Sequence, residues 1–134
     1  MKIESKIGKS ESSDEKIYNY ISNFDNFKDL IPPDRVTDWE SSGDKCSFRV
    51  DPVGRMSLQI IEKEPYKLLK MSSVPALSPH EFSMWVQLRK VEEDDTRIKI
   101  TIEPKVNALL LPMIKSPLKK FVDALIDRME AYSF

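Results

Sequence analysis

The sequence predicts a single α+β domain in which a curved antiparallel sheet of six to seven strands is closed by a C-terminal helix. Several segments of the chain alternate apolar and polar side chains with period 2, which is the pattern of half-buried strands. Short turns join most of these segments, and strands linked by hairpins pair antiparallel. Residues 117–132 instead repeat apolar side chains at helical spacing, so a helix there can cover the apolar face of the sheet.

The N-terminal part of the chain predicts one strand followed by two short helices, or by one kinked helix. Residues 3–7 alternate, and Ile7 is expected to share the face of the other odd-numbered side chains. Ser12 stands three residues before Glu15, the spacing of a capping box, so helical structure is expected to begin there. The apolar pattern continues at helical spacing until the pair Pro32–Pro33, which ends it.

The middle of the chain returns to period 2 and predicts a series of strands separated by turn residues. The run Asp51-Pro52-Val53-Gly54 favours a hairpin turn, and residues 75–79, with a proline at each end, are expected to form a loop. The expected strands lie around residues 36–41, 46–50, 56–60, 66–73, 80–88 and 97–103.

The final helix is expected over residues 117–132, with Ser116 as its N-cap and Pro117 at its first position. The apolar run 108–114 before it predicts an earlier helical turn kinked by Pro112, or else a non-helical plug. The inward-facing side chains of this helix are Leu118, Phe121, Val122, Leu125, Ile126 and Met129.

Composition narrows the class of protein. The chain has 134 residues, 40% of them hydrophobic and 32% charged, and it lacks a Gly/Ser-rich linker, so residues 1–134 are interpreted as one globular domain. Its net charge is -1, with no long basic run, which argues against nucleic acid as a partner. The N-terminus has no apolar signal-peptide core and Cys46 is the only cysteine, which favours the cytoplasm. The run 108–114 is far shorter than the ~20 residues of a membrane span, so integral membrane insertion is not expected.

Three segments, together with the order of elements, resemble one known superfamily. They are SDEKIYNYISNF at 13–24, IIEKEPYKLL at 60–69 and PLKKFV at 117–122. They resemble the START and polyketide-cyclase-like superfamily, whose helix-grip fold is also called SRPBCC, and the resemblance covers nearly the whole chain. It implies a hydrophobic pocket between the concave face of the sheet and the terminal helix, used elsewhere for lipids, sterols, quinones or polyketides. The glycine-rich loop of the plant pathogenesis-related branch is missing, because the three glycines are isolated, so that branch is not assigned.

The expected partner is therefore a hydrophobic small molecule, with no cofactor and no metal. Methionines suit such a pocket because their flexible thioethers adapt to irregular ligands, although ordinary core packing is the alternative for each of them. The residues expected to line the pocket are Phe48, Met56, Leu58, His80, Phe82, Met84, Val86, Ile100, Met113, Phe121 and Leu125.

Few side chains suggest catalysis, and no catalytic residue is assigned. His80, the only histidine, is either a general base at the pocket mouth or a half-solvated residue at a strand start, and its neighbour Glu81 should point to the opposite face. Cys46 lies on an inward row and is interpreted as a small core residue rather than a thiolate. Arg55 is either a ligand for a carboxylate or an exposed hairpin residue. Trp85, on the polar side of its strand, is either covered by another element or part of a homodimer contact.

Three functional hypotheses follow. The first is binding or carrying a hydrophobic small molecule such as a lipid, a quinone or a polyketide-like compound. The second is a cyclase-, aromatase- or hydratase-like enzyme acting on a polyketide-like substrate. The third is a co-chaperone-like interaction module with a solid interior, using Trp85 and residues 108–114 as its contact surface. The first requires an enclosed cavity of several hundred cubic ångströms, on the ~300–1,000 Å³ scale of ligand sites.

Overall fold

The computed structural model describes residues 1–74 and 80–134, and the loop expected at 75–79 lies outside these ranges. Within them the chain forms eight strands, two α-helices and one 3-10 helix, η1. In chain order these are β1 (Ile3–Glu4), β2 (Gly8–Ser10), α1 (Asp14–Ile21), η1 (Phe24–Asp29), β3 (Thr37–Ser42), β4 (Lys45–Val50), β5 (Gly54–Glu64), β6 (Leu68–Ser72), β7 (Glu81–Glu92), β8 (Asp95–Lys105) and α2 (Leu111–Ala131).

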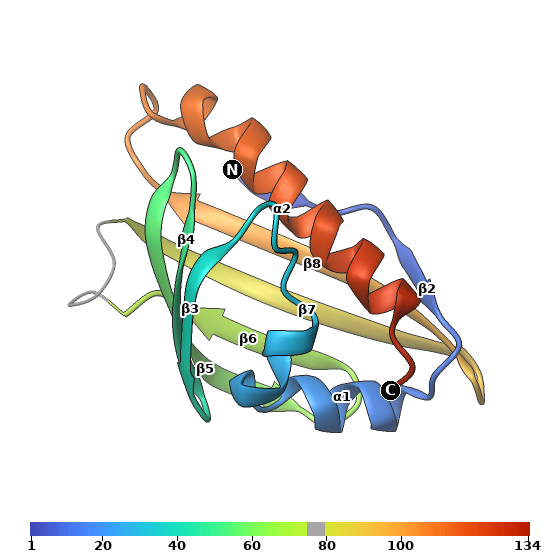
Figure 1. The fold of residues 1–134 in the computed structure, drawn as a ribbon. Helices are drawn as coiled ribbons and strands as arrows, with labels where there is room; N and C mark the ends of the chain where they lie inside the picture. Colours follow the sequence, from blue (N-terminus) through green and yellow to red (C-terminus); the bar gives the residue numbers. More distant parts are fainter. Residues whose placement is uncertain (75–79) are drawn as a thin grey trace.

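The strands form one antiparallel sheet that curves around helix α2 (Figure 1). Its order is β1-β8-β7-β6-β5-β4-β3, and β2 also pairs with β8. Helix α2 packs on β1, β2 and β8, while α1 and η1 contact β7 and β3 respectively. The predicted α+β fold, a curved antiparallel sheet with two short N-terminal helices and a long C-terminal helix over its concave face, is confirmed.

The sheet has one strand more than the upper predicted number because the N-terminal strand is divided in two. β1 and β2 both pair with β8, and Ser5, between them, accepts the Ile100 N–H through its side-chain oxygen at 2.8 Å. The break between β1 and β2 shifts the alternation, so side chains after it do not continue on the faces that the pattern of residues 3–5 predicts. Ile7 is consequently 68% exposed, so its predicted place beside the other odd-numbered side chains is wrong.

The first helix begins one residue later than its sequence pattern predicts. The N-cap is Ser13, whose hydroxyl accepts the Lys16 N–H at 3.2 Å, rather than Ser12. Ser12 instead contacts the end of the chain, where its hydroxyl accepts the N–H of Phe134. Two adjacent serines offer the same capping chemistry, and the contact with the C-terminus decides between them.

Helix α2 is longer than predicted. It begins at Leu111, so Ser116 is not its N-cap, and Pro117 lies inside it. A proline inside a helix removes one backbone hydrogen bond, here the one to the carbonyl of the residue four positions earlier. The helix continues through it with a single apolar face, because Ile114 and Leu118 are one turn apart and both are buried. The apolar run before residue 117 is therefore helical from Leu111 onward, with Pro112 in its first turn.

Polar contacts hold α2 along the β1–β2 edge of the sheet. The Lys6 N–H donates to the carboxylate of Asp123 at 2.7 Å, and the Lys9 N–H donates to that of Glu130 at 2.9 Å. Lys6 lies between β1 and β2 and Lys9 lies within β2, and neither backbone donor has a ladder partner on the side of the helix. These contacts hold one side of α2, and the opposite side of the helix faces the concave surface of the sheet (Figure 1).

Candidate ligand-binding site

Residues from the sheet and from α2 surround two small apolar voids in the interior. The first, which we call void A, has a volume of about 10 Å³. It is lined by Phe24, Phe27, Ile31, Trp39, Phe48, Leu58, Met71, Met84, Phe121 and Leu125. Phe48, Leu58, Met84, Phe121 and Leu125 are among the residues that the sequence predicts to line a pocket, and here they meet around one point.

The second interior space, void B, also measures about 10 Å³ and lies nearer the N-terminal half of α2. It is lined by Val53, Met56, His80, Phe82, Pro104, Val106, Ile114 and Leu118. Met56, His80 and Phe82 are the predicted lining residues in this group. His80 is partly buried, whereas the neighbouring Glu81 pairs with Lys105 at 3.6 Å on the exposed side of the strand.

Three predicted lining residues contact neither void. Val86 and Ile100 are buried in the core, each 1% exposed. Met113 is 66% exposed, so its predicted inward position is wrong. Since α2 already begins at Leu111, Met113 lies on the first turn of the helix, on the side turned to water.

The interior is packed more tightly than the sequence predicts. A cavity of about 10 Å³ is at the limit for a single water molecule, whereas ligand sites usually measure ~300–1,000 Å³. Among the described residues, the two spaces found between sheet and α2 are therefore far smaller than the predicted enclosed cavity of several hundred cubic ångströms. Aromatic rings occupy much of the space: the ring centroids of Phe48 and Phe121 are 5.6 Å apart across the gap between sheet and helix.

Trp39 is a site residue that the sequence interpretation missed. It follows Asp38, whose φ of 56° is in the left-handed region, and the two residues form a bulge in β3 opposite Phe48 of β4. A bulge turns the following side chain away from the regular alternation. The Trp39 ring stacks on Phe27 and Phe48, with centroid distances of 6.1 and 5.5 Å. The only sequence signal was a large aromatic side chain between Asp38 and Glu40.

The indole Nε1–H of Trp39 is buried and has no hydrogen-bond acceptor among the described residues. No other buried side-chain nitrogen or oxygen of residues 1–74 and 80–134 is unsatisfied in this way. A buried donor without an acceptor costs about 1–3 kcal/mol, so it requires a physical explanation. This donor belongs to a residue that lines void A.

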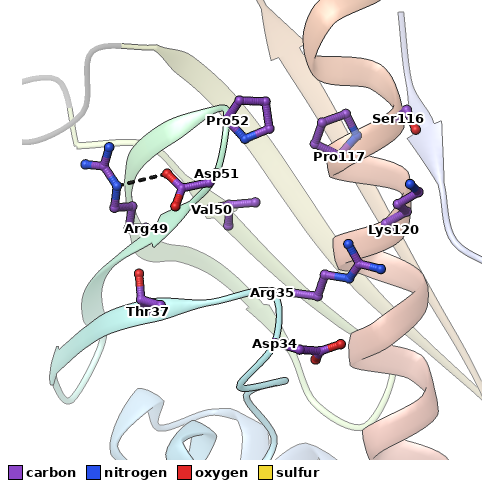
Figure 2. A pocket seen from close by; sticks show the side chains of 10 residues that line it. All are labelled: Asp34, Arg35, Thr37, Arg49, Val50, Asp51, Pro52, Ser116, Pro117 and Lys120. Carbon is purple, nitrogen blue, oxygen red and sulfur yellow. Dashed lines mark hydrogen bonds and ion pairs between the residues drawn. The ribbon is translucent and has the colours of Figure 1, made fainter.

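A larger pocket opens on the surface beside α2 (Figure 2). It has a volume of about 240 Å³, and β3, the β4–β5 turn and α2 supply its walls. Its lining residues are Asp34, Arg35, Thr37, Arg49, Val50, Asp51, Pro52, Ser116, Pro117 and Lys120. Pro52 and Pro117 face each other across it, and the Arg35 side chain extends toward Lys120 (Figure 2).

The surface pocket carries more positive than negative charge. Arg49 pairs with Asp51 at 3.0 Å, and its side chain is directed away from α2 (Figure 2). Among the described residues, Arg35 and Lys120 make no ion pair within 4.0 Å, although Asp34 also lines the pocket. The pocket therefore suits a polar or anionic group better than an apolar one.

Residues that are adjacent in the chain line the surface pocket and the interior. Pro52 lines the pocket and the next residue, Val53, lines void B. The same alternation occurs on α2, where Pro117 lines the pocket and Leu118 lines void B. Adjacent residues of the same two segments thus line the surface pocket and void B.

The contacts of Cys46, Arg55 and Trp85 are accounted for by the packing and the surface of the sheet. Burial raises the pKa of the Cys46 thiol, which confirms its interpretation as a core residue. Arg55 donates to the Ser47 hydroxyl at 3.0 Å in a partly buried contact, and it pairs with Glu40 at 3.5 Å at the exposed surface. Trp85 lies on the outer side of the sheet, where two lysine ammonium groups are placed over its ring at 5.2 and 5.5 Å.

Neither a metal site nor a membrane-spanning helix is found in the part of the chain that the structure describes. Over residues 1–74 and 80–134, no three His, Cys, Asp or Glu side chains are placed to hold a metal ion. In the same ranges, no helix is both long and apolar enough to cross a bilayer.

The architecture is that of START-like helix-grip proteins. No protein-family model and no curated protein matches the chain. A START superfamily protein from Mycobacterium smegmatis has a TM-score of 0.74 at 12% identity, covering 97% of this chain and 94% of that one. Norcoclaurine synthase from Thalictrum flavum, solved with dopamine and hydroxybenzaldehyde, has a TM-score of 0.69 at 15% identity, covering 100% and 88%. The Aha1 dimer from Colwellia psychrerythraea has a TM-score of 0.62 at 20% identity, covering 97% and 96%. At such identities the likeness shows a START/SRPBCC-type fold and not a function.

Proposed function

We propose that the protein binds a hydrophobic small molecule, such as a lipid, a quinone or a polyketide-like compound, between the sheet and α2. The observation that carries this proposal is the pair of apolar voids there, to whose walls eight of the eleven predicted pocket residues contribute. The norcoclaurine synthase structure, which has the same type of fold, holds dopamine and hydroxybenzaldehyde, and this supports the proposal.

Binding requires the interior to expand. Voids A and B are far smaller than a ligand, so side chains must move to merge or enlarge them. Their walls contain Met56, Met71 and Met84, whose unbranched side chains repack at little cost. The polar contacts of α2 with the β1–β2 edge can remain in place, because they lie on the side of the helix away from the voids.

The surface pocket provides the access route in this proposal. A molecule with an apolar body and a polar end can place its polar end near Arg35 and Lys120. Its apolar body then needs only the displacement of Val53 or Leu118 to reach void B. The proximity of pocket and void supports this route.

Native mass spectrometry of freshly purified protein, together with displacement of an apolar fluorescent dye, tests the proposal. We expect a bound small molecule or dye binding to the wild type, and tighter dye binding to Leu125→Ala, which enlarges void A. Leu69→Ala is the matched control, because Leu69 is buried but lines neither void. The proposal is wrong if nothing co-purifies and the dye binds neither the wild type nor Leu125→Ala.

An interaction module is a second candidate, favoured by an exposed apolar patch at the start of α2. Leu109, Leu110 and Met113 are 81%, 41% and 66% exposed. The packed interior also fits this candidate, and the Aha1 structure is described as a dimer. In a pull-down from native extract we expect a stoichiometric protein partner if this candidate holds. A co-purifying small molecule without a protein favours the first proposal.

A further inference from the structure

Among residues 1–74 and 80–134, the Trp39 indole N–H is the one buried side-chain polar group without a hydrogen-bond partner, and Trp39 lines void A. The other nine side chains that line void A are phenylalanine, isoleucine, leucine or methionine. None of these side chains offers an oxygen acceptor. The side chains of void A therefore supply no oxygen acceptor for this donor, whereas an oxygen of a molecule bound there can.

The backbone of β3 holds Trp39 in this position. Asp38 adopts the left-handed conformation that a non-glycine residue rarely takes, and the bulge it forms lies opposite Phe48. Such a backbone persists only when the surrounding packing stabilises it, and here the ring of Trp39 stacks on Phe27 and Phe48. The donor is thus fixed before any ligand binds.

A single water molecule is a poor acceptor at this point. Void A is barely large enough for one water, and a buried water typically makes about three hydrogen bonds. Of the side chains that line void A, only Trp39 could form a hydrogen bond with such a water, through its indole N–H. An oxygen carried by an apolar molecule avoids this problem, because its remaining atoms contact the apolar walls favourably.

We propose that the Trp39 Nε1–H donates a hydrogen bond to a carbonyl oxygen of the molecule bound between sheet and α2. This inference rests on the proposed function and narrows the ligand class to apolar molecules that carry a carbonyl group, such as ketones. Trp39 is a binding residue in this account, and no chemical step is assigned to it.

Acetophenone and ethylbenzene form a suitable pair of probes, since both carry a two-carbon side chain on a phenyl ring and only the ketone has an acceptor. Binding is measured by NMR titration of wild type, Trp39→Phe and the control Trp85→Phe, which changes the outer face of the sheet. We expect Trp39→Phe to lower the preference for the ketone by about tenfold, the effect of one hydrogen bond to a previously unsatisfied donor. Trp85→Phe should leave the preference unchanged.

The wild-type protein gives a second readout that does not depend on the variant folding. The Trp39 indole proton resonance should move downfield with acetophenone and not with ethylbenzene. If both probes bind while this resonance and the preference in Trp39→Phe stay the same, the Trp39 inference is wrong but the binding function stands. If neither probe binds and the dye does not bind either, the binding proposal and the Trp39 inference both fail.

Discussion

Cys46 shows how burial sets the chemistry of a single side chain. It is 5% exposed on the inward face of β4, and the loss of solvent raises the pKa of its thiol above the ordinary value of 9.0. A backbone hydrogen bond with Leu58 favours the thiolate but is the weaker influence. The thiol therefore stays protonated, which makes it a poor nucleophile.

The protonated state of Cys46 predicts slow alkylation. At pH 9 to 10 we expect iodoacetamide to modify the folded protein much more slowly than the urea-unfolded chain, in which the thiol ionises near 9.0. Because the folded-state pKa is the higher one, the unfolded chain loses its proton first as the pH rises. The free energy of unfolding should thus fall above pH 9.0 by up to about 1.4 kcal/mol per pH unit. Comparison with Cys46→Ala isolates this contribution, and equal alkylation rates in both states would contradict it.

At the scale of elements, β3 and α2 depart from regular structure where the candidate site is formed. The bulge at Asp38 moves Trp39 into the aromatic cluster with Phe27 and Phe48. Pro117 lies within α2 and lines the surface pocket, while the next residue lines void B. Both irregularities lie where residues of the surface pocket alternate with residues that line the interior voids, which is the route of entry in the proposed function.

At the scale of the whole molecule, the sheet and α2 approach each other closely at Gly8. A Cβ atom added there would lie 2.6 Å from Cγ2 of Ile126, on a side chain of α2 that is fully buried. Real Cβ atoms do not approach other atoms this closely, so α2 or β2 would have to shift. The short strand β2 can lie under the helix only because residue 8 has no side chain.

Gly8→Ala is therefore expected to destabilise the fold by about 1–3 kcal/mol, the usual cost of overpacking a core. Urea unfolding followed by circular dichroism measures the change. In an Ile126→Ala background, which removes the atom that the new methyl group would meet, Gly8→Ala should cost distinctly less. An equal cost in both backgrounds would mean that the two layers do not meet here.

Much of the fold was predictable because periodicity is a local property of the chain. The alternation in residues 80–88 and 97–103 fits β7 and β8, and the helical spacing of Phe121 and Leu125 fits the buried face of α2. Capping was less predictable, because Ser12 and Ser13 are chemically equivalent and a contact with the C-terminus selects between them. Periodicity also accounts for the burial of most predicted lining residues, whereas Met113 is exposed because α2 begins earlier than the sequence pattern predicts.

The sequence by itself determined the α+β class, the order of elements and the side chains that point between sheet and helix, since each follows from spacing along the chain. Only the tertiary structure decided how much space remains between those side chains, because a volume depends on sheet curvature and on the rotamers of facing residues together. The tertiary structure also decided that Trp39 packs against the core. A bulge shifts the side-chain alternation, and local periodicity does not reveal it. The unsatisfied indole N–H can be recognised only from the tertiary structure, because the positions of all surrounding donors and acceptors must be known.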